Sequence, residues 1–142
     1  MDIDQSQNRM NRRALFAMLM APACAGPPES PLGIAELFLE HYLISVDQER
    51  AMEIARGLAR EKLEGEIHDV AGVRAAGATV ARTDVPRYVL VEERPGERDA
   101  TIFLFDISMP GDEDAASRRI LVAVSPEDDS WAVTNYGFYP IR

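Results

Sequence analysis

The amino-acid sequence predicts an α+β domain in which N-terminal helices pack on a curved, four-stranded antiparallel sheet. Two observations support this class. Apolar residues recur at intervals of three and four over 47–77, which is the period of an amphipathic helix. Beyond residue 77 the pattern changes to β-prone segments separated by turns, as in an antiparallel meander. A helical apolar stripe needs a surface to cover it, and the sheet provides one.

Two helical segments are expected before the sheet. The first covers 31–45, and the second is one long, bent helix over 47–77. Ser45 and Gln48 have the spacing of a capping box before the second helix, and Asp47 is an alternative N-cap. The apolar stripe expected to face the sheet consists of Ala51, Ile54, Ala55, Leu58, Ala59 and Leu63.

The expected strands are 88–93, 101–108, 119–124 and 131–138. In the second strand, alternation places Leu104 and Asp106 on one face and Phe103 and Phe105 on the other. Asp106 therefore continues an apolar row. A carboxylate in such a place either enters a pocket or marks the point at which the strand meets water.

Composition limits the classes of function. The chain has 142 residues, 46% of them hydrophobic and 27% charged, which suits one domain plus a short extra segment. A formal net charge of −9 repels phosphate backbones, so nucleic-acid binding is not expected. Cys24 is the only cysteine, which excludes an internal disulfide and any metal site built from several cysteines.

Residues 1–23 have the pattern of a secretory signal peptide. An arginine pair precedes the apolar run 14–20, and small residues lead from this run to Cys24. The run is too short to span a bilayer, which takes about 20 residues as a helix. Its end is similar to the lipobox of bacterial lipoproteins, and this resemblance implies lipidation of Cys24. Residues 24–31 then form the lipidation site and a stiff, Pro-rich tether.

Alternatives stay open for this segment. Met10 is an alternative start to Met1, because it gives a more compact signal. The arginine pair fits twin-arginine export as well as Sec export. An amphipathic helix or a buried hydrophobic arm is the structural alternative. Export is favoured, with the domain lipid-anchored in the periplasm or at the outer-membrane surface.

Two segments of the body carry a family resemblance. They are HYLISVDQERAMEIARGLA at 41–59 and SWAVTNYGFYPI at 130–141. With helices first and the sheet after, they resemble the NTF2-like or cystatin-like superfamily, in its uncharacterised bacterial lipoprotein type. The resemblance implies a single domain over 32–142 with a hollow between helix and sheet. The helical segment is longer and more continuous than in the enzymatic members.

Candidate catalytic residues are few. His41 and His68 are the only histidines, and both belong to helical segments with many solvated charges. The resemblance suggests an acid/base pair of His68 with Asp69, as in some isomerases and dehydratases of the superfamily. Asp106 is the third candidate, but no partner for it is identifiable in the sequence. We therefore expect none of the three candidates to be catalytic.

Two interpretations of function remain. The favoured one is a non-catalytic, exported, membrane-tethered domain that binds a protein or a small apolar ligand in the helix–sheet hollow. The alternative is a cofactor-free isomerase, dehydratase or hydrolase that uses Asp106 with a histidine or tyrosine. The pocket residues expected in either case are Phe38, Tyr42, Leu104, Asp106, Trp131 and Tyr136.

Partners follow from the same observations. The expected partners are the membrane through the lipid anchor and either a protein or a small apolar ligand; a homodimer is also compatible with the sequence. No metal is expected, because the acidic runs 112–114 and 127–129 lack the spacing of a calcium-binding loop. No cofactor is expected either, because the sequence contains no glycine-rich phosphate loop.

Overall fold

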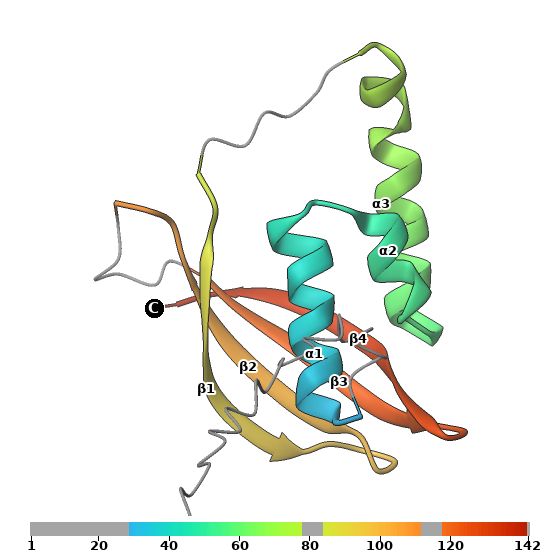
Figure 1. Ribbon diagram of the computed structural model, residues 1–142, viewed down its shortest axis with the longest axis vertical. Coiled ribbons are helices and arrows are strands. Elements are labelled where there is room, and N and C mark those ends of the chain that lie inside the picture. Colours follow the sequence, from blue (N-terminus) through green and yellow to red (C-terminus); the bar gives the residue numbers. More distant parts are fainter. Residues whose placement is uncertain (1–28, 78–83, 112–117, 142) are drawn as a thin grey trace, which may run out of the picture.

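The computed structural model describes residues 29–77, 84–111 and 118–141. Helices come first and a four-stranded antiparallel sheet follows, in the order β1-β2-β3-β4 (Figure 1), which confirms the predicted α+β class. The predicted signal peptide, Cys24 and the acidic run 112–114 lie outside the described residues. The elements are α1 (Pro31–Leu39), the π-helical turn η1 (Glu40–Ile44), α2 (Gln48–Glu53), α3 (Gly57–Ala75), β1 (Arg87–Pro95), β2 (Thr101–Ser108), β3 (Arg118–Glu127) and β4 (Ser130–Pro140).

The first two helices begin at side-chain caps. The Oγ of Ser30 accepts a hydrogen bond from the backbone N–H of Gly33 at 3.0 Å, with Pro31 at the first helical position. The Oδ1 of Asp47 accepts a hydrogen bond from the backbone N–H of Arg50 at 3.0 Å. Asp47, one of the two predicted caps, is therefore the N-cap of α2. Each cap satisfies a backbone donor that the helix leaves without a partner.

The single long helix predicted over 47–77 is two helices. The helix α2 ends at Glu53. Ala55 then belongs to a short extended segment that lies beside β4. There the backbone N–H of Val133 donates to the carbonyl of Ile54 at 2.9 Å, and the N–H of Arg56 donates to the carbonyl of Val133 at 2.8 Å. These bonds to the edge of the sheet compensate for the helical bonds lost at the break.

Gly57 makes the return to helix possible. Its φ of +53° lies in the left-handed region, where a side chain would be strained. From there α3 is continuous to Ala75, so Gly65 does not interrupt the helix. The break redirects α3 so that it contacts α2 and β4, while its far end stands away from the sheet (Figure 1).

The break also changes which residues of the predicted stripe are buried. Ala51, Ala55, Ala59 and Leu63 are fully buried, but Leu58 is 49% exposed. The expectation that Leu58 packs on the sheet is therefore wrong. A helix that restarts at Gly57 rotates its apolar side relative to α2, so one period cannot describe both helices.

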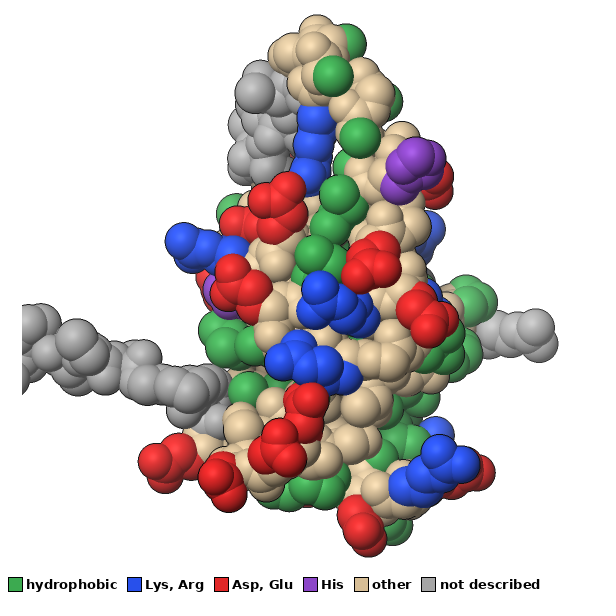
Figure 2. All heavy atoms as spheres, turned by 90° about the vertical axis from the view of Figure 1, so that its right-hand side faces the viewer, with side chains coloured by type: hydrophobic (Ala, Val, Ile, Leu, Met, Phe, Trp, Pro, Cys, Tyr) green, Lys and Arg blue, Asp and Glu red, His purple; other side chains and the backbone are tan. Residues whose placement is uncertain are grey.

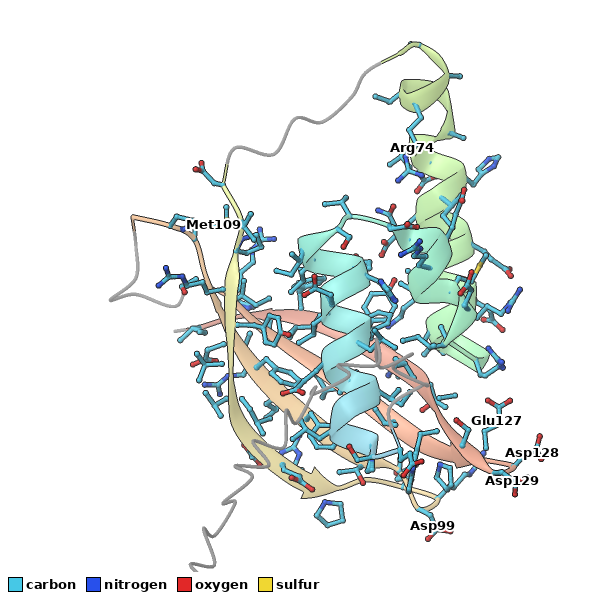
Figure 3. The ribbon with its side chains drawn as sticks, viewed as in Figure 1. Arg74, Asp99, Met109, Glu127, Asp128 and Asp129 are labelled. Atoms are coloured by element: carbon cyan, nitrogen blue, oxygen red, sulfur yellow. The ribbon has the colours of Figure 1, made fainter. Side chains whose placement is uncertain are left out.

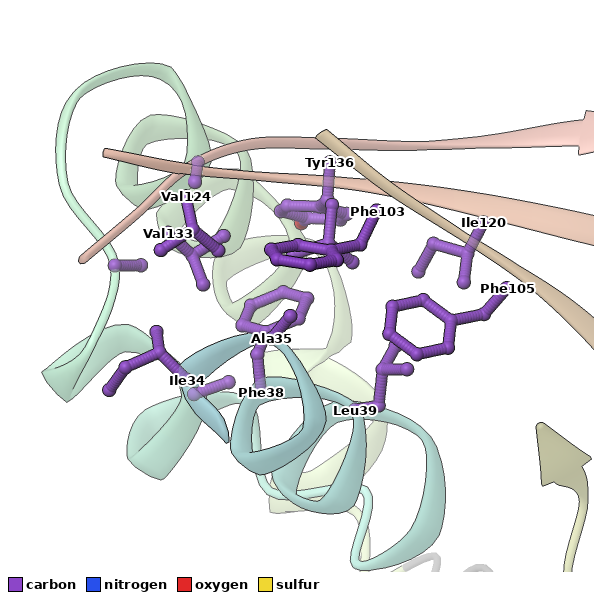
Figure 4. Packing of buried hydrophobic residues seen from close by; sticks show 14 of the residues in the cluster. Ile34, Ala35, Phe38, Leu39, Phe103, Phe105, Ile120, Val124, Val133 and Tyr136 are labelled. Atoms are coloured by element: carbon purple, nitrogen blue, oxygen red, sulfur yellow. The ribbon is translucent and has the colours of Figure 1, made fainter. Parts of the chain in front are cut away.

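The core lies between α1 and one face of the sheet. Phe103 and Phe105 point from β2 towards α1, where Phe38 and Leu39 meet them, and all four side chains are fully buried (Figure 4). Burial of such side chains contributes about 1.5–3 kcal/mol each. The ring of Phe38 also contacts that of Tyr136 on β4, at 5.0 Å between centroids. Side chains thus occupy the deep part of the space in which a hollow was expected.

The hairpin between β1 and β2 turns through two residues with positive φ. These are Arg98 (53°) and Asp99 (62°). The backbone N–H of Gly96 donates to the carbonyl of Ala100 at 2.8 Å and closes the loop. Consecutive positive φ values match the right-handed twist of the strands and are normally adopted by Asn-Gly.

Candidate functional site

The open end of the helix–sheet sandwich holds a groove of about 450 Å³, called the rim groove here. It forms where η1 and the start of α2 approach the end of β2, the start of β3 and the end of β4. The antiparallel order brings these strand ends together, because Ile107 pairs with Arg118 and Ile120 pairs with Phe138. The rim groove is lined by Tyr42, Leu43, Val46, Gln48, Pro86, Ile107, Met109, Arg118 and Phe138.

The lining of the rim groove is mainly apolar and partly open to solvent. Met109, labelled in Figure 3 beyond the end of β2, is 41% exposed, and Phe138 on β4 is 39% exposed. Among the described residues of the lining, Arg118 is the only charged one, while Tyr42 and Gln48 add polar groups. A volume of this size with few polar groups is typical of small-molecule sites.

One wall of the rim groove contains a strained residue. Val46 has a φ of +52°, in the left-handed region, which a β-branched side chain adopts rarely. The neighbouring backbone holds it there, because the N–H of Asp47 donates to the carbonyl of His41 at 2.8 Å. Such a conformation costs on the order of 1–3 kcal/mol and occurs at helix ends as well as at functional sites.

A second polar arrangement lies next to the rim groove and ties α3 to the rest of the domain. The hydroxyl of Tyr42 donates to Oε2 of Glu66 at 2.9 Å, and the hydroxyl of Tyr136 donates to Oε1 at 2.8 Å. We call these three residues the Glu66 clamp. Burial, followed by the hydrogen bond to Glu66, raises the pKa of both tyrosines above the ordinary value for a phenol. Both hydroxyls are therefore neutral donors at physiological pH.

Lys62 adds a second tie between α3 and β4. Its Nζ donates to Oδ1 of Asn135 at 2.8 Å and to the carbonyl oxygen of Tyr136 at 2.7 Å. It also lies 5.4 Å from the centre of the Tyr136 ring. Lys62 and Glu66 stand one helical turn apart, so one side of α3 makes all of these contacts.

The structure separates the six residues predicted to line one pocket. Phe38, Tyr42 and Tyr136 lie together on the helix side of the sheet, where their rings are in contact. Leu104 and Asp106 lie on the opposite face of the sheet, as alternation requires when Phe103 and Phe105 face the helices. Trp131 borders a third region, beside the acidic β3–β4 hairpin labelled in Figure 3 at Glu127, Asp128 and Asp129.

Asp106 has a partner that was not predicted from the sequence. Its two carboxylate oxygens accept hydrogen bonds from Arg119, at 2.6 Å from Nε and 3.2 Å from Nη2. Asp106 and Arg119 are paired in register on β2 and β3, which places the carboxylate and guanidinium side by side. The hydrogen bond to Asp106 raises the pKa of Arg119. This paired carboxylate faces away from the rim groove.

The histidine candidates lie on different helices. His41 is half-buried on η1, and His68 is exposed on the outer part of α3. Among the described residues, neither imidazole hydrogen-bonds to Asp106. Figure 2 shows acidic and basic side chains interleaved on the α3 side of the molecule, which is a solvated surface rather than a convergent polar cluster.

Several residues of the site were not predicted from the sequence. Arg118 could have been found, because Ile120, Val122 and Val124 alternate on the buried face of β3 and Arg118 continues that row. Glu66 gives no such signal, since it stands among the charged residues of α3. Val46 gives none either, because valine does not mark a positive φ.

The described ranges contain no group of three or more His, Cys, Asp or Glu side chains placed to hold a metal ion. In the same ranges, no helix has the length and apolar character needed to cross a membrane. A comparison of the chain with protein-family models found no match, and a comparison with characterised proteins found none either. Membership of the NTF2-like or cystatin-like superfamily therefore remains a prediction from the sequence.

Proposed function

We propose that the protein is a non-catalytic binding domain of the NTF2-like kind that takes a small apolar ligand in the rim groove. The observation that carries the proposal is the groove itself, with its mainly apolar lining at the open end of the sandwich. The strained Val46 in its wall supports it further. The ligand is placed at the rim because Phe38, Phe103 and Phe105 fill the deeper space.

The binding test uses a neutral apolar fluorophore, N-phenyl-1-naphthylamine, titrated with the body of the protein from residue 29 onwards. Met109→Trp adds bulk to the groove, and we expect about tenfold weaker binding, equivalent to about 1.4 kcal/mol. Val73→Trp is the matched control, because Val73 is exposed on the far part of α3, outside the groove lining. Absence of saturable binding, or equal binding by both variants, would contradict the proposal.

The enzyme alternative is less well supported, because its central residue lies on the other face of the sheet. Asp106 is paired with Arg119 and does not line the rim groove. We therefore expect Asp106→Asn, His41→Ala and His68→Ala to leave binding of the fluorophore unchanged. A folded Asp106→Asn variant that loses the cellular function would favour the enzyme instead.

Export and lipid anchoring are the second part of the proposal, supported by the arginine pair, the apolar run and the small residues before Cys24. Membrane-extracted protein is expected to lack residues 1–23 and to carry acyl mass on Cys24. The measurement is intact mass, with Cys24→Ala as the variant that loses the acyl group. An unmodified, full-length protein in the cytosol would refute this part without affecting the groove.

A further inference from the structure

We propose that the ligand of the rim groove is an anionic amphiphile, a free fatty acid, whose carboxylate pairs with Arg118. This inference rests on the proposed function and adds the chemical class of the ligand. The charge distribution in the groove carries it, because Arg118 is the only charged residue among the nine described residues that line it. The chain as a whole has a net charge of −9, so a cationic side chain in the groove contrasts with the acidic composition of the protein.

The strand register directs Arg118 towards the groove. Arg118 pairs with Ile107, which belongs to the buried row of β2, whereas Arg119 pairs with Asp106 on the opposite face. The side chains of these two consecutive arginines therefore lie on opposite faces of the sheet. Arg119 forms a two-point ion pair with Asp106, while Arg118 stands at the edge of an apolar lining.

Polar groups on the helix side of the groove are compatible with an anion. Gln48 lines the groove and accepts a hydrogen bond from Nη2 of Arg74, so a second guanidinium lies just behind the wall. The carboxylate of Asp47 caps α2 through the backbone N–H of Arg50. The carboxylate of Glu66 accepts two tyrosine hydroxyls and is not part of the lining.

The remaining lining suits a hydrocarbon chain. Leu43, Val46, Pro86, Ile107, Met109 and Phe138 contribute the apolar surface. A guanidinium at one edge of such a surface binds a carboxylate by charge-assisted hydrogen bonds. A single-chain carboxylate therefore satisfies both the apolar lining and the cation, which a neutral alcohol or a cationic amphiphile cannot do.

The test is displacement of N-phenyl-1-naphthylamine by decanoate, decanol and decyltrimethylammonium, each below the concentration at which it forms micelles. We expect decanoate to displace the probe at about tenfold lower concentration than decanol, since a hydrogen bond to a charged group is worth about that factor at a partly exposed site. Arg118→Gln should abolish this preference and Arg118→Lys should keep part of it. Arg119→Gln is the matched control on the opposite face and should keep all of it.

Each other outcome overturns the inference in a recognisable way. Equal displacement by decanoate and decanol would leave an apolar-ligand site without charge selection. A preference that survives Arg118→Gln would remove Arg118 from the site. Arg118-dependent binding to phosphatidylglycerol vesicles, without displacement by decanoate, would indicate a membrane surface in place of a free fatty acid. Failure of the fluorophore to bind at all would instead refute the proposed function.

Discussion

Replacement of Glu66 by alanine tests whether the Glu66 clamp holds α3 to the domain. The substitution removes the acceptor of two tyrosine hydroxyls, at 2.9 and 2.8 Å. Hydrogen bonds to charged groups contribute about 1.5–3 kcal/mol each. The side chain is half-buried, which favours the lower end of that range, and alanine recovers a few tenths of a kcal/mol in helix propensity. We expect a loss of about 2–3 kcal/mol in the free energy of unfolding.

The matched control lies two positions away from Glu66 on the same helix. Glu64 forms an exposed ion pair with Arg60 at 3.1 Å, so Glu64→Ala should cost no more than about 0.5 kcal/mol. Guanidinium chloride denaturation followed by circular dichroism measures both variants. The loss in free energy of unfolding caused by Glu66→Ala should also become much smaller when both Tyr42 and Tyr136 are replaced by phenylalanine. Equal stability of the Glu66 and Glu64 variants would show that the clamp contributes nothing to folding.

Three further predictions concern stability. Leu63→Ala should cost about 2–5 kcal/mol because the side chain is fully buried, whereas Leu58→Ala should cost less than about 1 kcal/mol; chemical denaturation of both variants decides. Because the two clamp tyrosines have raised pKa values, the unfolded state releases protons first above about pH 10. The free energy of unfolding should then fall with rising pH, by up to about 1.4 kcal/mol per pH unit for each tyrosine, and replacement of both by phenylalanine should remove this dependence in alkaline denaturation experiments. Arg98→Asn combined with Asp99→Gly should raise the stability by about 1 kcal/mol and the melting temperature by about 4 °C, since both positions have positive φ; an unchanged or lower melting temperature would contradict this.

The sheet could be predicted from the sequence because its signal is local. Each strand contains a run of β-branched, aromatic or other apolar residues, and each is bounded by Pro, Gly or acidic residues. The predicted range 101–108 coincides with β2, and the other three strands are only extended at their ends. The antiparallel order follows because each strand is a near neighbour of the next in the chain.

The helices were harder to predict because tertiary contacts decide where they break. The segment 47–77 has a helical period throughout, yet the edge of β4 forms two backbone hydrogen bonds with Ile54 and Arg56. Local helix propensity cannot reveal that partner, because Val133 follows Arg56 by 77 residues in the sequence. The position of Gly57 is the one local sign of the break, and it is equally compatible with a glycine inside a helix.

The candidate site could be predicted only in part. The aromatic group of Phe38, Tyr42 and Tyr136 was expected from the sequence and is found together on the helix side of the sheet. The rim groove was not expected, because it forms where five chain segments meet and no one of them has a distinctive pattern. Alternation separated Asp106 from Phe103 and Phe105, as found, but Asp106 was expected in the helix–sheet hollow and lies on the opposite face of the sheet. Only the pairing of β2 with β3 identifies Arg119 as its partner.

Tyr42 belongs to both the apolar rim groove and the polar Glu66 clamp. Its ring lines the rim groove and stacks on Phe38 at 5.4 Å between centroids, while its hydroxyl donates to Glu66 on α3. Among the described elements, α3 contacts α2 and β4, and it contributes no residue to the groove lining. The Glu66 clamp is therefore one of two routes by which α3 influences the groove, beside the hydrogen bond from Arg74 to Gln48, because it fixes the orientation of one wall. If this reasoning is correct, loss of the clamp weakens ligand binding as well as folding, even though Glu66 does not touch the ligand.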